Sequence, residues 1–122
     1  MLGTFPITAF VPTAQPDAAL AFYRDVLGLT FVGDTPFALL FDAHGIPLRV
    51  AKVETVTPQT GTTLGWRVDD IASIVATLAA RGVTFERYAG MGQDEAGIWS
   101  TPGGYVAWFK DPDGNLLSLS QD

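Results

Sequence analysis

The feature of this chain that most constrains its fold is a short sequence that occurs twice. Gly28-Leu29-Thr30-Phe31 is echoed by Gly82-Val83-Thr84-Phe85. In both places the glycine follows apolar residues at helical spacing, and a run with strand character comes after it. The elements predicted around each copy also follow a similar order. The sequence therefore predicts an internal duplication of a βαβββ unit, and the fold class is α+β.

One domain is predicted over 1–122, with a first repeat at 5–56, a second repeat at 60–122 and a linker within 54–62. The elements predicted for the first repeat are a strand at 7–12 ended by proline, a helix that starts at Pro16 and stops at Gly28, and strands at 29–32, 37–41 and 47–53. Those predicted for the second repeat are a strand at 63–68, a helix capped by Asp70 and ended by Gly82, a strand at 83–88, a strand with a mobile flap within 89–104, and a C-terminal hairpin.

The C-terminal hairpin is the most sharply defined of these elements. An aromatic-rich run leads into Asp111-Pro112-Asp113-Gly114-Asn115, and an alternating run leaves it. Asp-Pro favours the turn entry, and the Gly-Asn pair tolerates the positive φ of hairpin turns. If Lys110 pairs with Leu116, the antiparallel ladder places Trp108 opposite Ser118.

Composition excludes several classes of function. A net charge of −6 argues against nucleic acid and anionic membrane surfaces as partners. The complete lack of cysteine excludes disulfides, thiolate metal sites and a cysteine nucleophile. No apolar run approaches the roughly 20 residues that span a bilayer, and the first residues lack the features of a secretory signal. A cytoplasmic protein is expected.

The two predicted sheets are each covered by helix on one face only. Edge-to-edge pairing of these sheets would give an eight-stranded open sheet around a cleft, with the helices outside. Concave surfaces of this kind are where small ligands bind.

Four stretches carry a family resemblance. Together they extend over almost the entire chain in the expected order: Leu20–Leu29, Trp66–Ile71, Leu78–Val83 and Phe109–Asn115. The chain resembles the glyoxalase / bleomycin-resistance / extradiol-dioxygenase group, also called the vicinal oxygen chelate superfamily. This fold hosts isomerases, dioxygenases, transferases and drug-binding proteins without catalytic activity, so the resemblance supports the fold more than any single activity. It also implies a homodimer whose clefts are completed by the second subunit.

Catalytic members of that family hold one divalent metal with four side chains that point into the cleft. The resemblance places these four positions at Thr8, Arg49, Thr63 and Ser118. Neutral hydroxyls are weak ligands and a guanidinium repels a cation, so the residues at these positions do not suit a divalent ion. No metal and no other cofactor is expected.

Aromatic residues are the stronger signal for a ligand. Phe10, Trp99 and Trp108 are predicted to offer rings for stacking on a planar or apolar molecule, although plain core filling explains them as well. Trp66 is assigned to the core and the alternating Arg67 to the cleft. The predicted ligand-binding residues are Thr8, Phe10, Arg49, Thr63, Arg67, Trp99, Trp108 and Ser118.

The charged residues leave the sign of the ligand open. An arginine in an apolar cleft needs an anion, supplied by Glu54, by Glu86 or by the ligand. The overall acidity, with Asp94 and Glu95 in the flap, would instead favour a cationic ligand. His44 beside Asp42 could form a general base, but a solvated turn explains this pair better.

Three functions are compatible with these features. The first is a metal-free protein that binds and sequesters a planar or apolar organic compound. The second is a glyoxalase-type lyase or isomerase with an unusual metal site or none. The third is a protein-interaction subunit, which predicts a cleft filled by the protein's own side chains.

Overall fold

The computed structural model describes all residues from Met1 to Asp122. The chain divides into two compact units, Met1–Thr57 and Pro58–Asp122, called here the first and the second unit. The boundary between them lies inside the segment 54–62 that was predicted to be a linker. Each unit is described by itself.

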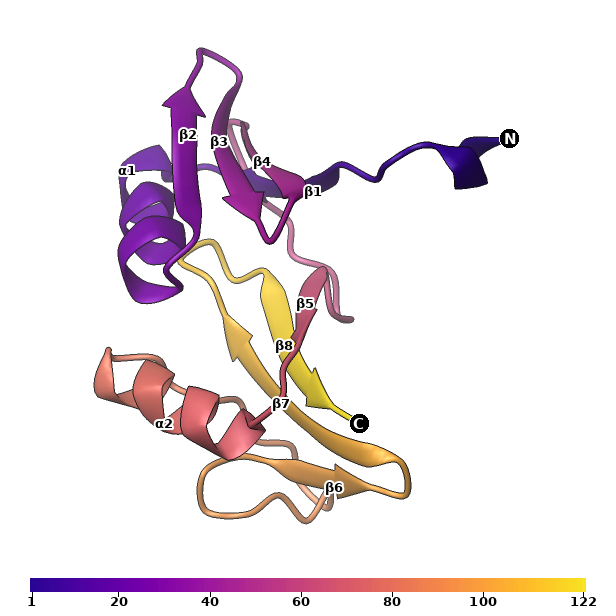
Figure 1. Cartoon of the computed structure of the whole chain (residues 1–122). Helices are drawn as coiled ribbons and strands as arrows, with labels where there is room; N and C mark the ends of the chain where they lie inside the picture. The colour runs from indigo at the N-terminus through magenta and orange to yellow at the C-terminus, as the bar shows by residue number, and fades with distance from the viewer. The chain divides into compact units, whose positions relative to one another are not determined.

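The first unit contains one mixed sheet of four strands. Its strand order is β1-β4-β3-β2, with β1 parallel to β4 and the other neighbours antiparallel (Figure 1). The elements are a 3-10 turn η1 (Leu2–Thr4), β1 (Ala9–Thr13), α1 (Pro16–Leu20), a π-helix η2 (Ala21–Val26), β2 (Thr30–Asp34), β3 (Ala38–Ala43) and β4 (Ile46–Lys52).

The second unit repeats this pattern. Its strand order is β5-β8-β7-β6, and again the first strand is parallel to the last (Figure 1). The elements are β5 (Leu64–Arg67), α2 (Ile71–Ala80), β6 (Trp99–Thr101), β7 (Gly104–Lys110) and β8 (Leu116–Gln121). The prediction of an α+β fold built from two tandem βαβββ repeats is confirmed, with an open four-stranded sheet in each repeat.

One face of the first sheet carries the core of its unit. Val11, Leu39 and Val50 are almost fully buried on that face. Tyr23 of η2 is also fully buried, and its ring lies 5.9 Å from the ring of Phe41. Tyr23 therefore places η2 on this face. Side chains alternate along a strand, so the residues between these core residues project from the opposite face, which no helix of this unit covers (Figure 1).

Two details of the first unit differ from the predictions. Pro12 lies inside β1, where it was expected to end the strand; β1 is an edge strand, and an edge tolerates proline. The predicted single helix begins at Pro16 and stops before Gly28, whose φ is 76°, but it changes to π geometry after Leu20. There the Leu27 N–H donates to the Phe22 carbonyl five residues earlier, at 2.9 Å.

In the second unit, α2 packs against β7 and β8. The predicted cap is confirmed, because the Ser73 N–H donates to the Asp70 carboxylate at 3.2 Å. Val75 and Leu78 are buried toward the sheet, whereas Ile74 is 36% exposed. The helix ends before Gly82, which takes a φ of 94°.

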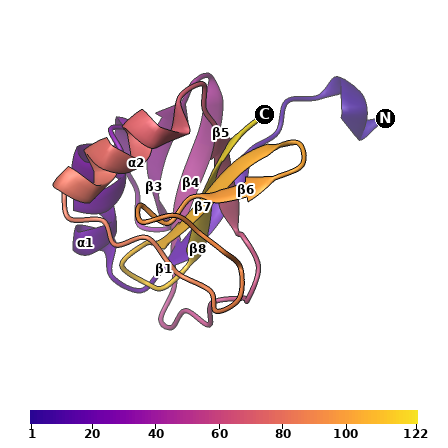
Figure 2. The same ribbon diagram turned by 90° about the horizontal axis from the view of Figure 1, so that it is seen from below.

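The strand predicted at 83–88 is wrong. The backbone of this segment pairs with β7 only through one isolated bridge, Phe85 to Phe109, and one hydrogen bond, from the Glu86 N–H to the Trp108 carbonyl. The Gln93 side chain satisfies backbone groups that a strand would pair: it accepts from the Tyr88 N–H at 2.7 Å and donates to the Glu86 carbonyl at 2.9 Å. The chain between α2 and β6 consequently runs as loops (Figure 2).

The C-terminal hairpin is confirmed, including the predicted pairs Lys110 with Leu116 and Trp108 with Ser118. Gly114 has a φ of 86°, as the turn requires. Asn115 could tolerate a positive φ but does not adopt one, and its side-chain amide donates to the buried carboxylate of Asp111.

Candidate pocket on the open face of the first sheet

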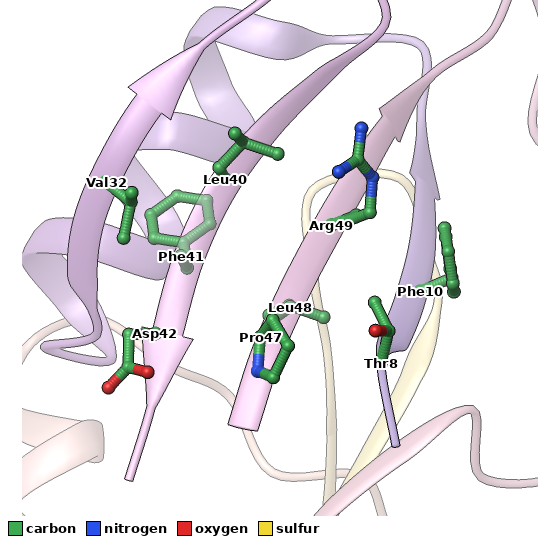
Figure 3. Close-up of a pocket in the computed structure, with 9 residues that line it drawn as sticks. All are labelled: Thr8, Phe10, Val32, Leu40, Phe41, Asp42, Pro47, Leu48 and Arg49. Carbon is green, nitrogen blue, oxygen red and sulfur yellow. The ribbon is translucent and has the colours of Figure 1, made fainter. Parts of the chain in front are cut away.

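A cavity of about 490 Å³ opens on the face of the first sheet that no helix covers. Its volume lies in the range typical of small-molecule sites. Figure 3 shows the residues that line it on β1, β2, β3, β4 and the residue just before β1. They are Thr8, Phe10, Val32, Leu40, Phe41, Asp42, Pro47, Leu48 and Arg49.

Strand register brings the polar and aromatic members of this set together. Arg49 is the register partner of Phe10 on the parallel neighbour β1 and of Leu40 on the antiparallel neighbour β3. Partners in a ladder project their side chains on the same face, so these three side chains form a row across the sheet. Thr8 lies two residues before Phe10 and therefore shares its face. Of the residues predicted to bind a ligand, Thr8, Phe10 and Arg49 thus line one pocket.

The Arg49 side chain is half-buried and makes no ion pair or hydrogen bond. The other two cations of the first unit are paired: Lys52 with Asp34, and Arg24 with Asp25. The Arg24 hydrogen bonds lower the pKa of the Asp25 carboxyl below its ordinary value. In the pocket, by contrast, the guanidinium faces mostly apolar walls.

Neither glutamate proposed as a partner for Arg49 fills that role. Glu86 forms its ion pair with Lys110, at 3.3 Å, within the second unit. Glu54 is exposed and lies in no ion pair. The prediction that Glu54 or Glu86 is the internal partner of Arg49 is therefore wrong.

Asp42 lies in the pocket lining, but its carboxylate is engaged in the turn that follows β3. The Gly45 N–H donates to it at 3.2 Å. His44 is exposed in that turn with a φ of 53° and does not line the pocket. The pair is accounted for by turn geometry, which is the interpretation that the sequence favoured.

The other predicted ligand residues lie in the second unit. Trp108 is opposite Ser118, and its ring stacks on Trp99 with 5.9 Å between centroids. Tyr88 meets Trp108 edge to face at 5.5 Å. Trp108 thus contacts both other rings, which supports a packing role for Trp99 and Trp108 beside the predicted role in binding.

The Ser118 hydroxyl occupies space that a side chain at Gly65 would need. Gly65 on β5 is its register partner, and a Cβ at Gly65 would lie 2.7 Å from the Ser118 Oγ.

Trp66 pairs in register with the buried Leu119, consistent with its assignment to the core. Arg67 is on the opposite face, with a highly exposed side chain 3.7 Å from the Asp122 carboxylate. Thr63 precedes β5, and its N–H donates to the Leu116 carbonyl at 2.8 Å.

Side-chain hydrogen bonds hold the segment within 89–104 that was predicted to be a mobile flap. The Asp94 carboxylate accepts from the Ala96 N–H at 3.0 Å and from the Ile98 N–H at 2.8 Å. The Glu95 carbonyl accepts from Arg87. Asp94 therefore has the turn function that the sequence interpretation did not give it, and these backbone contacts explain its presence without a cationic ligand.

The metal site of the family does not fit the residues present. The four corresponding positions hold Thr8, Arg49, Thr63 and Ser118, and none offers an imidazole or a carboxylate. Nowhere does the chain gather three or more His, Cys, Asp or Glu side chains in a group that could hold a metal ion. No reaction step through such an ion follows from these side chains.

Sequence reasoning missed part of the pocket lining. Leu40 and Asp42 alternate along β3, and this period of two would have identified them once the register with Arg49 was known. Val32 lies at a register irregularity between Phe31 and Gly33, so alternation alone could not place it.

Comparison with known proteins agrees with this fold. The family model described as Glyoxalase/Bleomycin resistance protein/Dioxygenase superfamily matches residues 6–119. No curated protein shows significant similarity to the chain. No helix of the structure is both long and apolar enough to cross a bilayer.

Three solved structures illustrate the similarity. An antibiotic binding protein, TnmS3 from Streptomyces sp. CB03234, is 28% identical over 97% of both chains, with a TM-score of 0.73. A superfamily member from Sphaerobacter thermophilus DSM 20745 is 24% identical over the full length of both, with a TM-score of 0.75. A lactoylglutathione lyase from Agrobacterium tumefaciens is 21% identical over 97% of this chain and 93% of its own, with a TM-score of 0.74. With its duplicated βαβββ architecture and a family match over nearly its whole length, the chain belongs to the glyoxalase/bleomycin resistance protein/dioxygenase superfamily.

Proposed function

We propose that this chain is a cytoplasmic protein that binds a small organic molecule without the help of a metal ion and holds it unchanged. The observation that carries the proposal is the pocket of about 490 Å³ in the first unit, which is lined by two phenylalanines, other apolar side chains, one hydroxyl, one carboxylate and one guanidinium. This mixture of apolar walls with a few polar groups is typical of sites for drug-sized ligands.

The ring of Phe10 supports a planar or apolar ligand. Phe10 is 59% exposed in a position where it lines the pocket. An aromatic ring held at the mouth of an apolar pocket gains by stacking on a second ring. The resemblance to an antibiotic binding protein is in line with a role in sequestering such a compound.

The alternative of a lyase or isomerase needs a group that polarises an oxygen or moves a proton. In the pocket only Arg49 and Asp42 carry charge, and Asp42 is engaged by a backbone N–H. A guanidinium is not deprotonated in proteins, so Arg49 could polarise a substrate oxygen but supplies no base to move a proton. The pocket therefore favours binding over catalysis.

A Phe10→Ala variant tests the proposal. We expect a panel of planar aromatic compounds with two to four fused rings to contain members that raise the melting temperature of the wild-type protein. Their affinity, measured by isothermal titration calorimetry, should fall roughly tenfold in Phe10→Ala, because a stacked ring contributes about 0.5–1.5 kcal/mol beyond its buried area.

The matched control is Phe37→Ala, which removes the same side chain from a 78% exposed position outside the pocket lining. It should leave affinity unchanged. Equal losses in both variants, or no stabilisation by any compound, would contradict the proposed function. Stoichiometric stabilisation by a divalent ion such as Ni²⁺, Zn²⁺ or Mn²⁺ would instead favour the metal-dependent enzyme.

We also propose that the chain is a homodimer. The N-terminal segment extends away from the sheet of its own unit (Figure 1), and it exposes large apolar side chains. These are Met1, Leu2, Phe5 and Ile7, each more than 60% exposed. Size-exclusion chromatography with light scattering should give twice the mass of 13.0 kDa. Removal of residues 1–5 should shift the equilibrium toward monomer. A mass of one chain for the full-length protein would refute the dimer.

A further inference from the structure

We infer that the ligand of this pocket carries a negatively charged oxygen group, such as a carboxylate or an ionised phenol or enol, which pairs with Arg49. The inference rests on the proposed binding function and names the class of molecule bound. It settles a choice that the sequence left open, because the overall acidity of the chain and the arginine in its cleft pointed to opposite charges.

The first step is the state of the Arg49 guanidinium. It is the only Lys or Arg side chain of the first unit without a carboxylate partner, and it donates to no neutral acceptor instead. A half-buried guanidinium that is left unpaired keeps a desolvation cost with no compensating interaction. An anionic ligand group would supply that interaction, and the planar fork of arginine suits two oxygens of one group.

The second step concerns the acids of the first unit. Asp34 and Asp25 are occupied by Lys52 and Arg24. Asp42, the acid in the pocket lining, points away from Arg49 in Figure 3 and accepts from the Gly45 N–H. Asp17 and Glu54 form no ion pair, so no acid of this unit pairs with the guanidinium.

The third step concerns the surroundings of the charge. Leu40 is the register partner of Arg49, and Phe10 flanks it on the other side. Apolar side chains beside an ion pair reduce its contact with water and lower the local dielectric constant, which strengthens the pair. The net charge of −6 acts mainly over longer distances, where salt screens it with a Debye length of about 8 Å at physiological ionic strength. Contact with Arg49 therefore outweighs the general repulsion of an anion.

Matched pairs of compounds test the inference. 2-Naphthoate and anthracene-2-carboxylate carry the negative oxygen group, and 2-naphthamide and anthracene-2-carboxamide are neutral molecules of nearly the same shape. We expect the wild-type protein to bind each acid roughly 10- to 100-fold more tightly than its amide in calorimetric titrations, as a hydrogen-bonded charge pair predicts.

Arg49→Gln should reduce this preference to about twofold or less, chiefly because it weakens the binding of the acids. Arg24→Gln changes the net charge by the same amount outside the pocket, so it should keep the preference. Circular dichroism would establish that both variants are folded, which is expected because neither guanidinium is part of the core.

The outcomes separate the inference from the function on which it rests. Equal binding of acids and amides, with both weakened roughly tenfold in Phe10→Ala, would overturn the anionic ligand and keep the binding function. A preference that survives in Arg49→Gln would overturn the assignment to Arg49. Failure of all four compounds and of the wider aromatic panel would overturn the binding function and the inference together.

Discussion

Replacement of Phe109 by alanine should lower the free energy of unfolding by about 3–5 kcal/mol. Phe109 is fully buried in β7, opposite Leu117, and its ring lies 5.5 Å from that of Phe85. Phe85 is attached to β7 by a single bridge to Phe109, so the contact also holds the loop segment that replaces the predicted strand. Loss of the ring leaves a cavity that this packed site cannot close fully.

Urea denaturation followed by tryptophan fluorescence measures this loss. All three tryptophans lie in the second unit, so the signal reports on the part of the chain that contains Phe109. Tyr105→Ala removes an aromatic ring from the same strand at a position that is 43% exposed, and it should cost less than about 1 kcal/mol. If both variants lost the same stability, Phe109 would not be the core residue described above.

Asp111→Ala should destabilise the second unit by about 3 kcal/mol through its hairpin turn. The buried carboxylate accepts from the Asp113 N–H and the Asn115 N–H, both at 2.9 Å, and from the Asn115 side-chain amide at 2.8 Å. Asn115 is itself buried, so removal of the acceptor takes hydrogen bonds from donors that water does not readily reach. A buried donor that loses its acceptor costs more than the average hydrogen bond contributes.

Asp111→Asn serves as the conservative comparison, because its carbonyl oxygen can still accept one of these hydrogen bonds. It should retain part of the stability that alanine loses. Lys110→Ala removes the neighbouring side chain, which is 53% exposed and forms only a surface ion pair, and should change stability by less than about 1 kcal/mol. Equal stability of Asp111→Ala and the wild type would show that the turn does not depend on the carboxylate.

Predictions that rested on local chemistry agree with the structure. The Asp111–Asn115 turn, the Asp70 cap and the glycine stop at Gly82 each depend on residues within a few positions of one another. The duplication of βαβββ units was recognisable for the same reason, since periodicity and turn residues are local signals. The strand predicted at 83–88 failed because the Gln93 side chain satisfies its backbone groups, a contact that strand propensity does not reveal.

For the candidate site, the sequence by itself determined which chemical groups are present: hydroxyls and a guanidinium where metal-binding relatives have imidazoles and carboxylates. The tertiary structure alone decided that Phe10, Arg49 and Leu40 form one row, because their register depends on the pairing of strands far apart in the chain. It also decided that Arg49 has no internal partner, because Glu86 is taken by Lys110. An ion pair depends on positions in space, and the sequence gives only the candidates for it.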